Sequence, residues 1–176
     1  WTTLKPRPGC SQGKQMNGIL FLVVGPSGAG KDTLMLGARA HLANDDRFVF
    51  ARRSITRPAD PGGEDHEAID VTEFNRRRDA GGFLAHWQAH ELNYGLPVAL
   101  ENELAAGKNV LANVSRAVIP EIIGRYQPTK VVEVTAPREI LTARLRARGR
   151  ESEGDLKRRL ARKIAPYPPQ ADVLTI

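Results

Sequence analysis

The chain has 176 residues, the usual size of a single domain and enough to bury a core. Its 26 Lys and Arg against 20 Asp and Glu give a formal net charge of +6, which favours an anionic partner. Few aromatic residues are interleaved with the basic ones for base stacking, so we expect no nucleic acid and favour a small phosphorylated molecule. One cysteine and no apolar stretch of membrane-spanning length predict no internal disulfide, no membrane partner and a cytoplasmic location. None of these features sets the oligomeric state.

The N-terminal stretch differs in composition from the rest of the chain. Residues 1–18 are polar, rich in Gly, Pro and Lys, and lack the apolar centre of a secretion signal. This composition predicts a flexible N-terminal extension over residues 1–18, followed by a single domain over residues 19–176.

Beyond this extension, short apolar runs alternate with helical patterns. Strands are predicted at 19–24, 48–51, 110–114, 131–135 and 173–176, and helices at 32–43, 72–80 and 138–148. Pro137 suits the first turn of the last helix and Gly149 its end. The alternation is typical of the α/β class, with a mainly parallel sheet flanked by helices.

The first predicted strand runs directly into the sequence GPSGAGKDT. A strand followed by a glycine-rich turn and a lysine is the pattern of a phosphate-binding loop, whose backbone N–H groups surround phosphates at a helix N-terminus. Lys31 adds a mobile positive charge for the β and γ phosphates. We therefore expect ATP as a co-substrate, bound by Gly25, Pro26, Ser27, Gly28, Ala29, Gly30, Lys31, Asp32 and Thr33.

Residues 54–97 interrupt the alternation with turn-rich sequence, and we expect this insert to bind the phosphate acceptor. Arg57 and His66 flank a loop rich in Pro and Gly, which could direct both side chains at a phosphate. Ser115 and Arg116 could contribute from the opposite side. An ordinary surface loop is the alternative for Arg57 and His66, and equally for Glu64 and Asp65, which could otherwise bind sugar hydroxyls.

Six stretches occur in the order found in guanylate kinase and its relatives: GPSGAGKDT, SITRP, GGEDH, GGFLAHW, NYGLP and RLRARGR. The chain resembles that family over residues 20–164. The resemblance implies a P-loop kinase fold with an acceptor-binding insert at about 54–97 and an Arg-rich lid at about 144–162. Within the family, ITRPADPGGEDH, HWQAHELNYG and RGRE look like the ribose 1,5-bisphosphate phosphokinases. The implied reaction transfers the ATP γ-phosphoryl group, with Mg²⁺, to a small phosphorylated sugar.

The resemblance also implies roles for individual residues. Arg57 and Tyr94 match acceptor-phosphate positions, and His66 stands where the nucleotide kinases have a tyrosine. The lid arginines are Arg144, Arg148 and Arg159, of which Arg144 and Arg148 would bind ATP. Lys31, Arg148 and Arg159 would stabilise charge during phosphoryl transfer. The alternative for the arginines of the lid is a solvated basic face.

Three departures from guanylate kinase bear on the acceptor and the metal. Ala85 replaces a glutamate that accepts hydrogen bonds from guanine, which argues against GMP as acceptor. Asp60 replaces the second arginine of the loop that binds the acceptor phosphate in the nucleotide kinases. Asn113 replaces an aspartate at a strand end, so we expect the carboxylate of Asp32 to hold the magnesium ion in its place. The alternative is that Asp32 only favours the positive end of its helix.

Three further possibilities stay open at the level of sequence. His86 and His90 could bind a metal, although we prefer them as a pocket wall. A nucleoside-monophosphate kinase would keep the chemistry and change the acceptor. A non-catalytic binding module of guanylate kinase-like fold would use the same surface, but the complete phosphate loop with Lys31 favours an enzyme.

Overall fold

The computed structural model describes residues 14–58, 64–89, 91–147 and 166–176. Its larger sheet, the central sheet, has five strands in the order β2-β7-β1-β8-β9, and every neighbouring pair is parallel. The strands are β1 Lys14–Val24, β2 Phe48–Phe50, β7 Asn109–Asn113, β8 Tyr126–Glu133 and β9 Asp172–Thr175. The mainly parallel α/β fold predicted from the sequence is confirmed.

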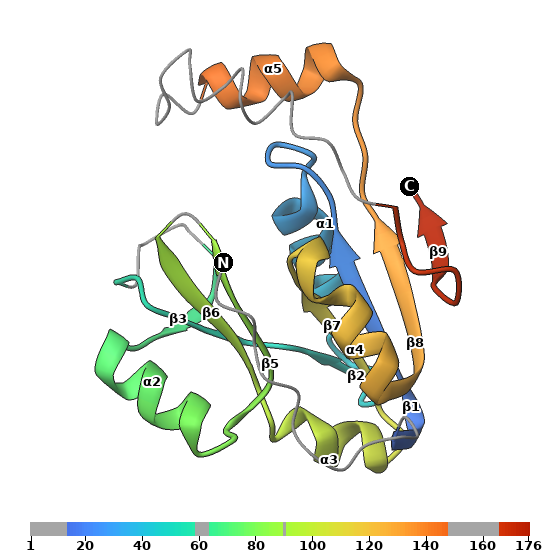
Figure 1. Ribbon diagram of the computed structural model, residues 1–176. Coiled ribbons are helices and arrows are strands. Elements are labelled where there is room, and N and C mark those ends of the chain that lie inside the picture. Colours follow the sequence, from blue (N-terminus) through green and yellow to red (C-terminus); the bar gives the residue numbers. More distant parts are fainter. Residues whose placement is uncertain (1–13, 59–63, 90, 148–165) are drawn as a thin grey trace.

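Helices cover the central sheet and cross the ends of its strands (Figure 1). They are α1 Lys31–His41, α3 Leu100–Ala105, the 3₁₀ turn η1 Arg116–Val118, α4 Ile119–Arg125 and α5 Arg138–Ala147. In Figure 1, α4 lies against the sheet, whereas α5 crosses above the ends of β1 and β8. None of the described helices is both long and apolar enough to cross a membrane.

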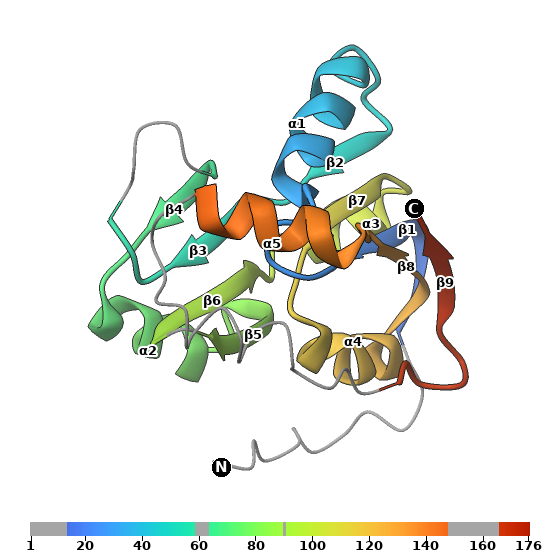
Figure 2. The same cartoon turned by 90° about the horizontal axis from the view of Figure 1, so that it is seen from above.

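A second, four-stranded sheet lies beside the central one and is called the acceptor sheet here (Figures 1 and 2). Its order is β4-β3-β6-β5, with β3 parallel to β4 and antiparallel to β6. The strands are β3 Arg53–Ile55, β4 His66–Ala68, β5 Phe83–Ala89 and β6 Leu92–Pro97. Helix α2, Val71–Asp79, packs on one face through Phe74, whose ring stacks on Phe83 at a centroid distance of 4.8 Å.

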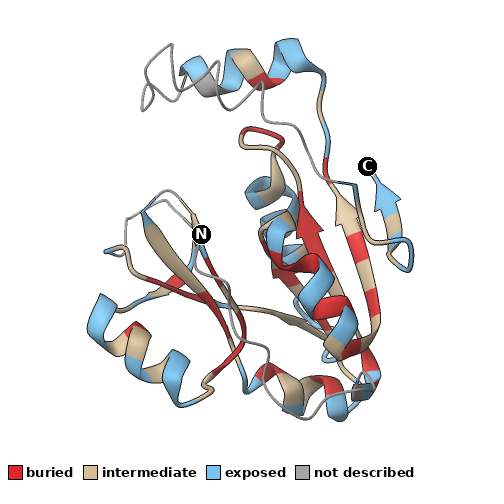
Figure 3. Cartoon of the chain, viewed as in Figure 1, coloured by how far each residue is buried: buried red, intermediate tan, exposed pale blue. Residues whose placement is uncertain are grey.

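One apolar core joins the two sheets. Leu22, Val110 and Val131 of the central strands are fully buried, and the same cluster includes Ala85, Trp87 and Leu96 of the acceptor sheet. Figure 3 shows buried segments on strands of both sheets. The acceptor sheet therefore turns one face to the core and the other to α2.

Residues 14–18 correct the predicted N-terminal extension. They form the start of β1, where Lys14 pairs with Tyr126 and Gln15 with Gln127 of β8. Met16 is 4% exposed and packs in the core, which explains why a stretch of polar composition is ordered there. Residues 1–13 lie outside the described part of the chain.

The other predicted elements are found with small shifts. The strand expected at 131–135 begins earlier, at Tyr126, and the helix expected at 32–43 ends at His41. The strands of the acceptor sheet were not predicted; two of them, β3 and β4, have three residues each and carry charged side chains. Such short strands show no clear alternation of apolar and polar residues.

Two glycines offer a matched test of this packing. In Gly95→Ala the new Cβ would lie 2.5 Å from ring atoms of Phe83, which is 4% exposed and stacked on Phe74. The ring cannot move away freely, so we expect a loss of about 1–3 kcal/mol in the free energy of unfolding.

Gly37→Ala is the control. No atom lies within 4 Å of its added Cβ, and in helix α1 an alanine should stabilise by roughly 0.5–1 kcal/mol. Urea unfolding of both variants measures the difference. Equal midpoints for the two variants would contradict the described contact between Gly95 and Phe83.

Candidate functional site

The predicted phosphate loop lies between β1 and α1, where the central parallel strands end. Lys31 Nζ donates hydrogen bonds to the carbonyl oxygens of Gly25, at 2.9 Å, and Pro26, at 3.1 Å. Gly30 caps α1 with φ 100°, a left-handed conformation that favours glycine. The loop is therefore wound around its own lysine at the N-terminus of an eleven-residue helix, the geometry that favours a bound anion.

Gly25 is required by close approach to the neighbouring strand. A Cβ at this position would lie 2.2 Å from the carbonyl oxygen of Val134, the residue after β8. Val134 N in turn donates to the carbonyl oxygen of Val24 at 2.8 Å. The loop thus starts at a fixed distance from the end of β8.

Helix α5 brings Arg144 to this loop from the other end of the chain. Arg144 Nη1 donates to the carbonyl oxygens of Gly28, at 3.1 Å, and Ala29, at 3.3 Å. Arg144 therefore lies against the phosphate loop, and its contact with ATP stays a prediction. Arg148 and Arg159, the other lid candidates, lie outside the described residues.

Asp32 and Asn113 meet at the edge where β7 ends. Asn113 Nδ2 donates to Asp32 Oδ1 at 3.2 Å, although the two residues are 81 apart in sequence. Asp32 is exposed on the first turn of α1. The sequence argument paired these residues, and the structure places them together.

The protein offers one carboxylate, that of Asp32, as a ligand for a magnesium ion beside the phosphate loop. No group of three or more His, Cys, Asp or Glu that could hold a metal occurs in the part of the chain that the structure describes. Mg²⁺ commonly takes one or two carboxylates and completes its shell with water and substrate phosphates. A single carboxylate beside a phosphate loop fits that mode of binding. It does not fit a site in which the protein alone surrounds the ion.

On the acceptor side, Arg57 and His66 lie together at the end of β3. Arg57 Nη2 is 3.5 Å from His66 Nδ1, and Arg57 Nε is buried without a hydrogen-bond partner in the described structure. His66 is 4% exposed, and its two ring nitrogens lie 2.8 Å from the Glu64 carbonyl oxygen and 3.2 Å from that of Arg57. His66 therefore supports the backbone of this loop, and a direct phosphate contact would have to replace one of these bonds.

Glu64 and Asp65 make ion pairs in this structure. Glu64 accepts a hydrogen bond from Arg53 Nε at 2.7 Å. Asp65 accepts from Arg52 at 2.9 Å and from Arg39 of α1 at 3.3 Å, and Arg39 followed by Arg52 holds the pKa of its carboxyl below the usual range.

Tyr94 on β6 stacks on Trp87 of β5, with ring centroids 5.5 Å apart and planes 3° from parallel. Ala85 lies on the same face of the acceptor sheet, because it pairs with Leu96, two residues from Tyr94. This face looks away from α2 toward the core, and the Ala85 methyl group stands on it.

Arg53 was missed by the sequence analysis. It is 8% exposed, pairs with Glu64, and lies over the rings of Tyr94 and Trp87. The signal available in the sequence was an arginine directly before SITRP and a glutamate eleven residues later. The pairing of these two charges is set by the fold, not by local sequence.

Ser115 and Arg116 follow β7, as predicted, but they are engaged within the protein. Ser115 Oγ accepts from Ala117 N at 3.4 Å and begins the 3₁₀ turn. Arg116 pairs with Glu133 at the end of β8 and lies over the ring of Tyr167. Burial raises the pKa of Tyr167 to about 12, although the positive charge of Arg116 acts to lower it. The Tyr167 hydroxyl therefore stays protonated beside this pair.

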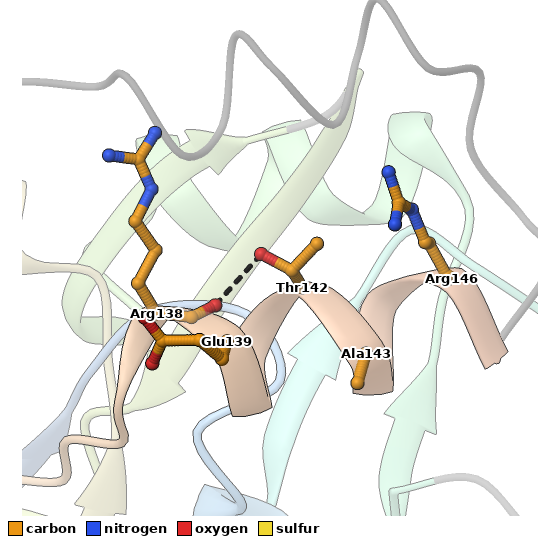
Figure 4. A pocket seen from close by; sticks show the side chains of 5 residues that line it. All are labelled: Arg138, Glu139, Thr142, Ala143 and Arg146. Carbon is orange, nitrogen blue, oxygen red and sulfur yellow. Dashed lines mark hydrogen bonds between the residues drawn. The ribbon is translucent and has the colours of Figure 1, made fainter.

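A shallow hollow of about 410 Å³ runs along α5 and is lined by Arg138, Glu139, Thr142, Ala143 and Arg146 (Figure 4). Arg138, Thr142 and Arg146 are spaced by four residues and share one face of the helix. Arg144 is turned about 200° from Thr142 at 3.6 residues per turn and contacts the phosphate loop instead. The hollow is thus separate from the phosphate loop.

No protein-family model matches the chain. The solved guanylate kinase of Anaplasma phagocytophilum is similar in fold, with a TM-score of 0.58 and 19% identity over 74% of this chain and 67% of that one. A bifunctional ribose 1,5-bisphosphokinase-thymidine phosphorylase of Azorhizobium caulinodans is 50% identical over 160 residues. The match covers 91% of this chain but 23% of that relative, so the chain spans about a quarter of the bifunctional protein.

Relatives of simpler organisation match over most of their own length. The ribose 1,5-bisphosphate phosphokinase PhnN of Brucella melitensis is 49% identical over 159 residues, covering 90% of this chain and 83% of the relative. The enzyme of the same name from Agrobacterium fabrum is 46% identical over 157 residues, covering 89% and 86%. With this identity over most of both chains, the protein belongs to the ribose 1,5-bisphosphate phosphokinase family.

Proposed function

We propose that the chain transfers the γ-phosphoryl group of ATP to the 1-phosphate of ribose 1,5-bisphosphate, giving 5-phospho-α-D-ribose 1-diphosphate and ADP. The observation that carries the proposal is a complete phosphate loop beside an acceptor sheet whose inner face presents Ala85. Membership of the ribose 1,5-bisphosphate phosphokinase family supports the same acceptor.

The reaction needs no general base. An oxygen of the 1-phosphate is already negatively charged near neutral pH and attacks the γ-phosphorus directly. The bond from that phosphorus to the β–γ bridging oxygen breaks, and the electron pair leaves with ADP. Catalysis then consists of alignment and stabilisation of charge on the transferred group.

On the donor side, the loop from Gly25 to Thr33 would surround the ATP phosphates with backbone N–H groups. Lys31 would exchange its bonds to the Gly25 and Pro26 carbonyl oxygens for phosphate oxygens. Arg144 lies against the loop and would add a second positive charge. Arg148 and Arg159 remain the proposed catalytic arginines of the lid.

Asp32 would hold Mg²⁺, with Asn113 orienting its carboxylate through the 3.2 Å hydrogen bond. The bound ion would supply positive charge to the β and γ phosphates. On the acceptor side, Arg57 and Tyr94 would bind phosphate. His66 would support Arg57, while Ser115 and Arg116 would line the opposite side.

The acceptor is tested by offering ribose 1,5-bisphosphate and GMP separately with ATP and Mg²⁺, and identifying products by mass. We expect phosphoribosyl diphosphate from the sugar and no GDP from GMP, because the Ala85 methyl group cannot accept the N–H groups of guanine. GDP as the main product would return the chain to the nucleotide kinases. Absence of product from both acceptors would favour a binding module, with ADP release from ATP alone as the control.

The magnesium role of Asp32 is tested with Asp32→Ser. If the carboxylate holds the ion, the Mg²⁺ concentration for half-maximal rate should rise about tenfold, because a hydroxyl is a weaker ligand for this hard cation. Thermal unfolding without Mg²⁺ should change little, since the helix-end effect of the charge is about 0.3–1 kcal/mol. An unchanged Mg²⁺ requirement would leave Asp32 with the helix role alone.

Arg144→Ala tests the donor side, with Arg146→Ala on the opposite face of α5 as its matched control. Loss of the guanidinium beside the phosphate loop should raise KM for ATP about tenfold, the value of one charge-assisted hydrogen bond, and leave KM for the acceptor unchanged. Steady-state kinetics with each substrate varied measures both. Equal effects of the two alanine variants would mean that α5 contributes only general charge.

A further inference from the structure

Arg53 is a charged residue on the inner face of the acceptor sheet. It is 8% exposed, and both its Nε and its Nη2 donate to the carboxylate of Glu64, the Nε bond being 2.7 Å long. A buried ion pair gives little stability relative to apolar residues of the same volume, because desolvation offsets the attraction. Stability alone therefore does not account for the pair, and its geometry points to another role.

The guanidinium of Arg53 lies over two aromatic rings. Its guanidinium carbon lies 5.2 Å from the ring centroid of Tyr94 and 5.9 Å from that of Trp87. These two rings are themselves stacked. A planar guanidinium can stack on aromatic rings while its edge binds a carboxylate, which an ammonium cannot do.

The same guanidinium binds the carboxylate of Glu64, and the backbone of Glu64 is connected to that of Arg57 through the ring of His66. The Glu64 carbonyl oxygen lies 2.8 Å from His66 Nδ1, and His66 Nε2 lies 3.2 Å from the Arg57 carbonyl oxygen. A neutral imidazole carries one N–H, so the ring donates a hydrogen bond to one of these two carbonyl oxygens and lies in contact with the other. Arg53 is thus connected to Tyr94 on one side and to Arg57 on the other.

We propose that Arg53 is a positioning residue for the phosphate acceptor, which fixes the distance between Tyr94 and the loop that carries Arg57. This inference rests on the proposed function, in which those two residues bind the acceptor phosphate. Glu64 is its partner in this role, and Trp87 is the surface on which it is held. Arg53 itself is too deeply buried to be a ligand of the substrate.

The test is Arg53→Lys, which keeps the positive charge and removes the planar fork. We expect kcat/KM for ribose 1,5-bisphosphate to fall about 10- to 100-fold, the effect of misplacing substrate-positioning groups, while KM for ATP changes less than about twofold. Glu64→Gln should act in the same direction. The double variant should be no worse than the more impaired single variant, because the pair acts as one unit.

Arg47→Lys is the matched control. Arg47 also binds a carboxylate through two nitrogens, at 2.9 and 2.7 Å from Asp45, and lies over the ring of Phe48, but it belongs to the edge of the central sheet. It should leave kcat/KM for both substrates unchanged. A fall in kcat/KM equal to that of Arg53→Lys would reduce the effect to general charge and overturn the proposal.

A spectroscopic readout separates this inference from the proposed function. The chain has two tryptophans, so Trp1→Phe leaves Trp87 as the reporter. Its emission should shift in Arg53→Lys and stay constant in Arg47→Lys. No turnover by the unchanged enzyme rejects the proposed function. An unchanged emission, or equal changes in the KM values for acceptor and ATP, rejects the positioning role whether or not that function holds.

Discussion

Parallel pairing of β1 with β7 on one side and β8 on the other is the constraint on which the rest of the structure depends. Leu20 to Val23 lie opposite Val110 to Asn113, and Leu20 to Val24 lie opposite Thr129 to Glu133. The carboxyl ends of three strands consequently meet at one edge. This edge is where open α/β sheets bind their ligands, and here it carries Lys31, Asn113 and Glu133.

The acceptor sheet is attached to this edge by contacts of two kinds. The shared apolar core includes Trp87 and Leu96 of the acceptor sheet. The pair from Arg39 of α1 to Asp65 is 3.3 Å long, with side chains 44% and 54% exposed, so it adds about 0–1 kcal/mol and is weakened by salt. The apolar contacts thus hold the two sheets together, and the ion pair adds a weak link between α1 and Asp65, the residue before β4.

How far the sequence predicts this protein depends on whether a feature is local. The phosphate loop follows its strand directly, so GPSGAGKDT was enough to predict the loop that Lys31 and Gly30 form. The meeting of Asp32 with Asn113, 81 residues away, followed from comparing substitutions within a family pattern. Arg53 and the short strands β3 and β4 were missed because their partners are set by the fold, which three-residue strands do not reveal.

Ala85 and Arg53 together suggest how the selectivity of the acceptor sheet for a nucleobase can be lost while the phosphate loop on the donor side stays the same. A methyl group at position 85 removes a hydrogen-bond acceptor from the inner face, and a buried charge there would be costly unless it were paired. Arg53 is paired with Glu64, which precedes β4, so the face carries a guanidinium whose charge is neutralised and offers no free carboxylate to a base. Because this charge is neutralised internally, beside a stacked pair of aromatic rings, the proposed recognition of the acceptor depends on Arg57 and Tyr94. The proposed acceptor, which has phosphate groups and no nucleobase, is consistent with such a face.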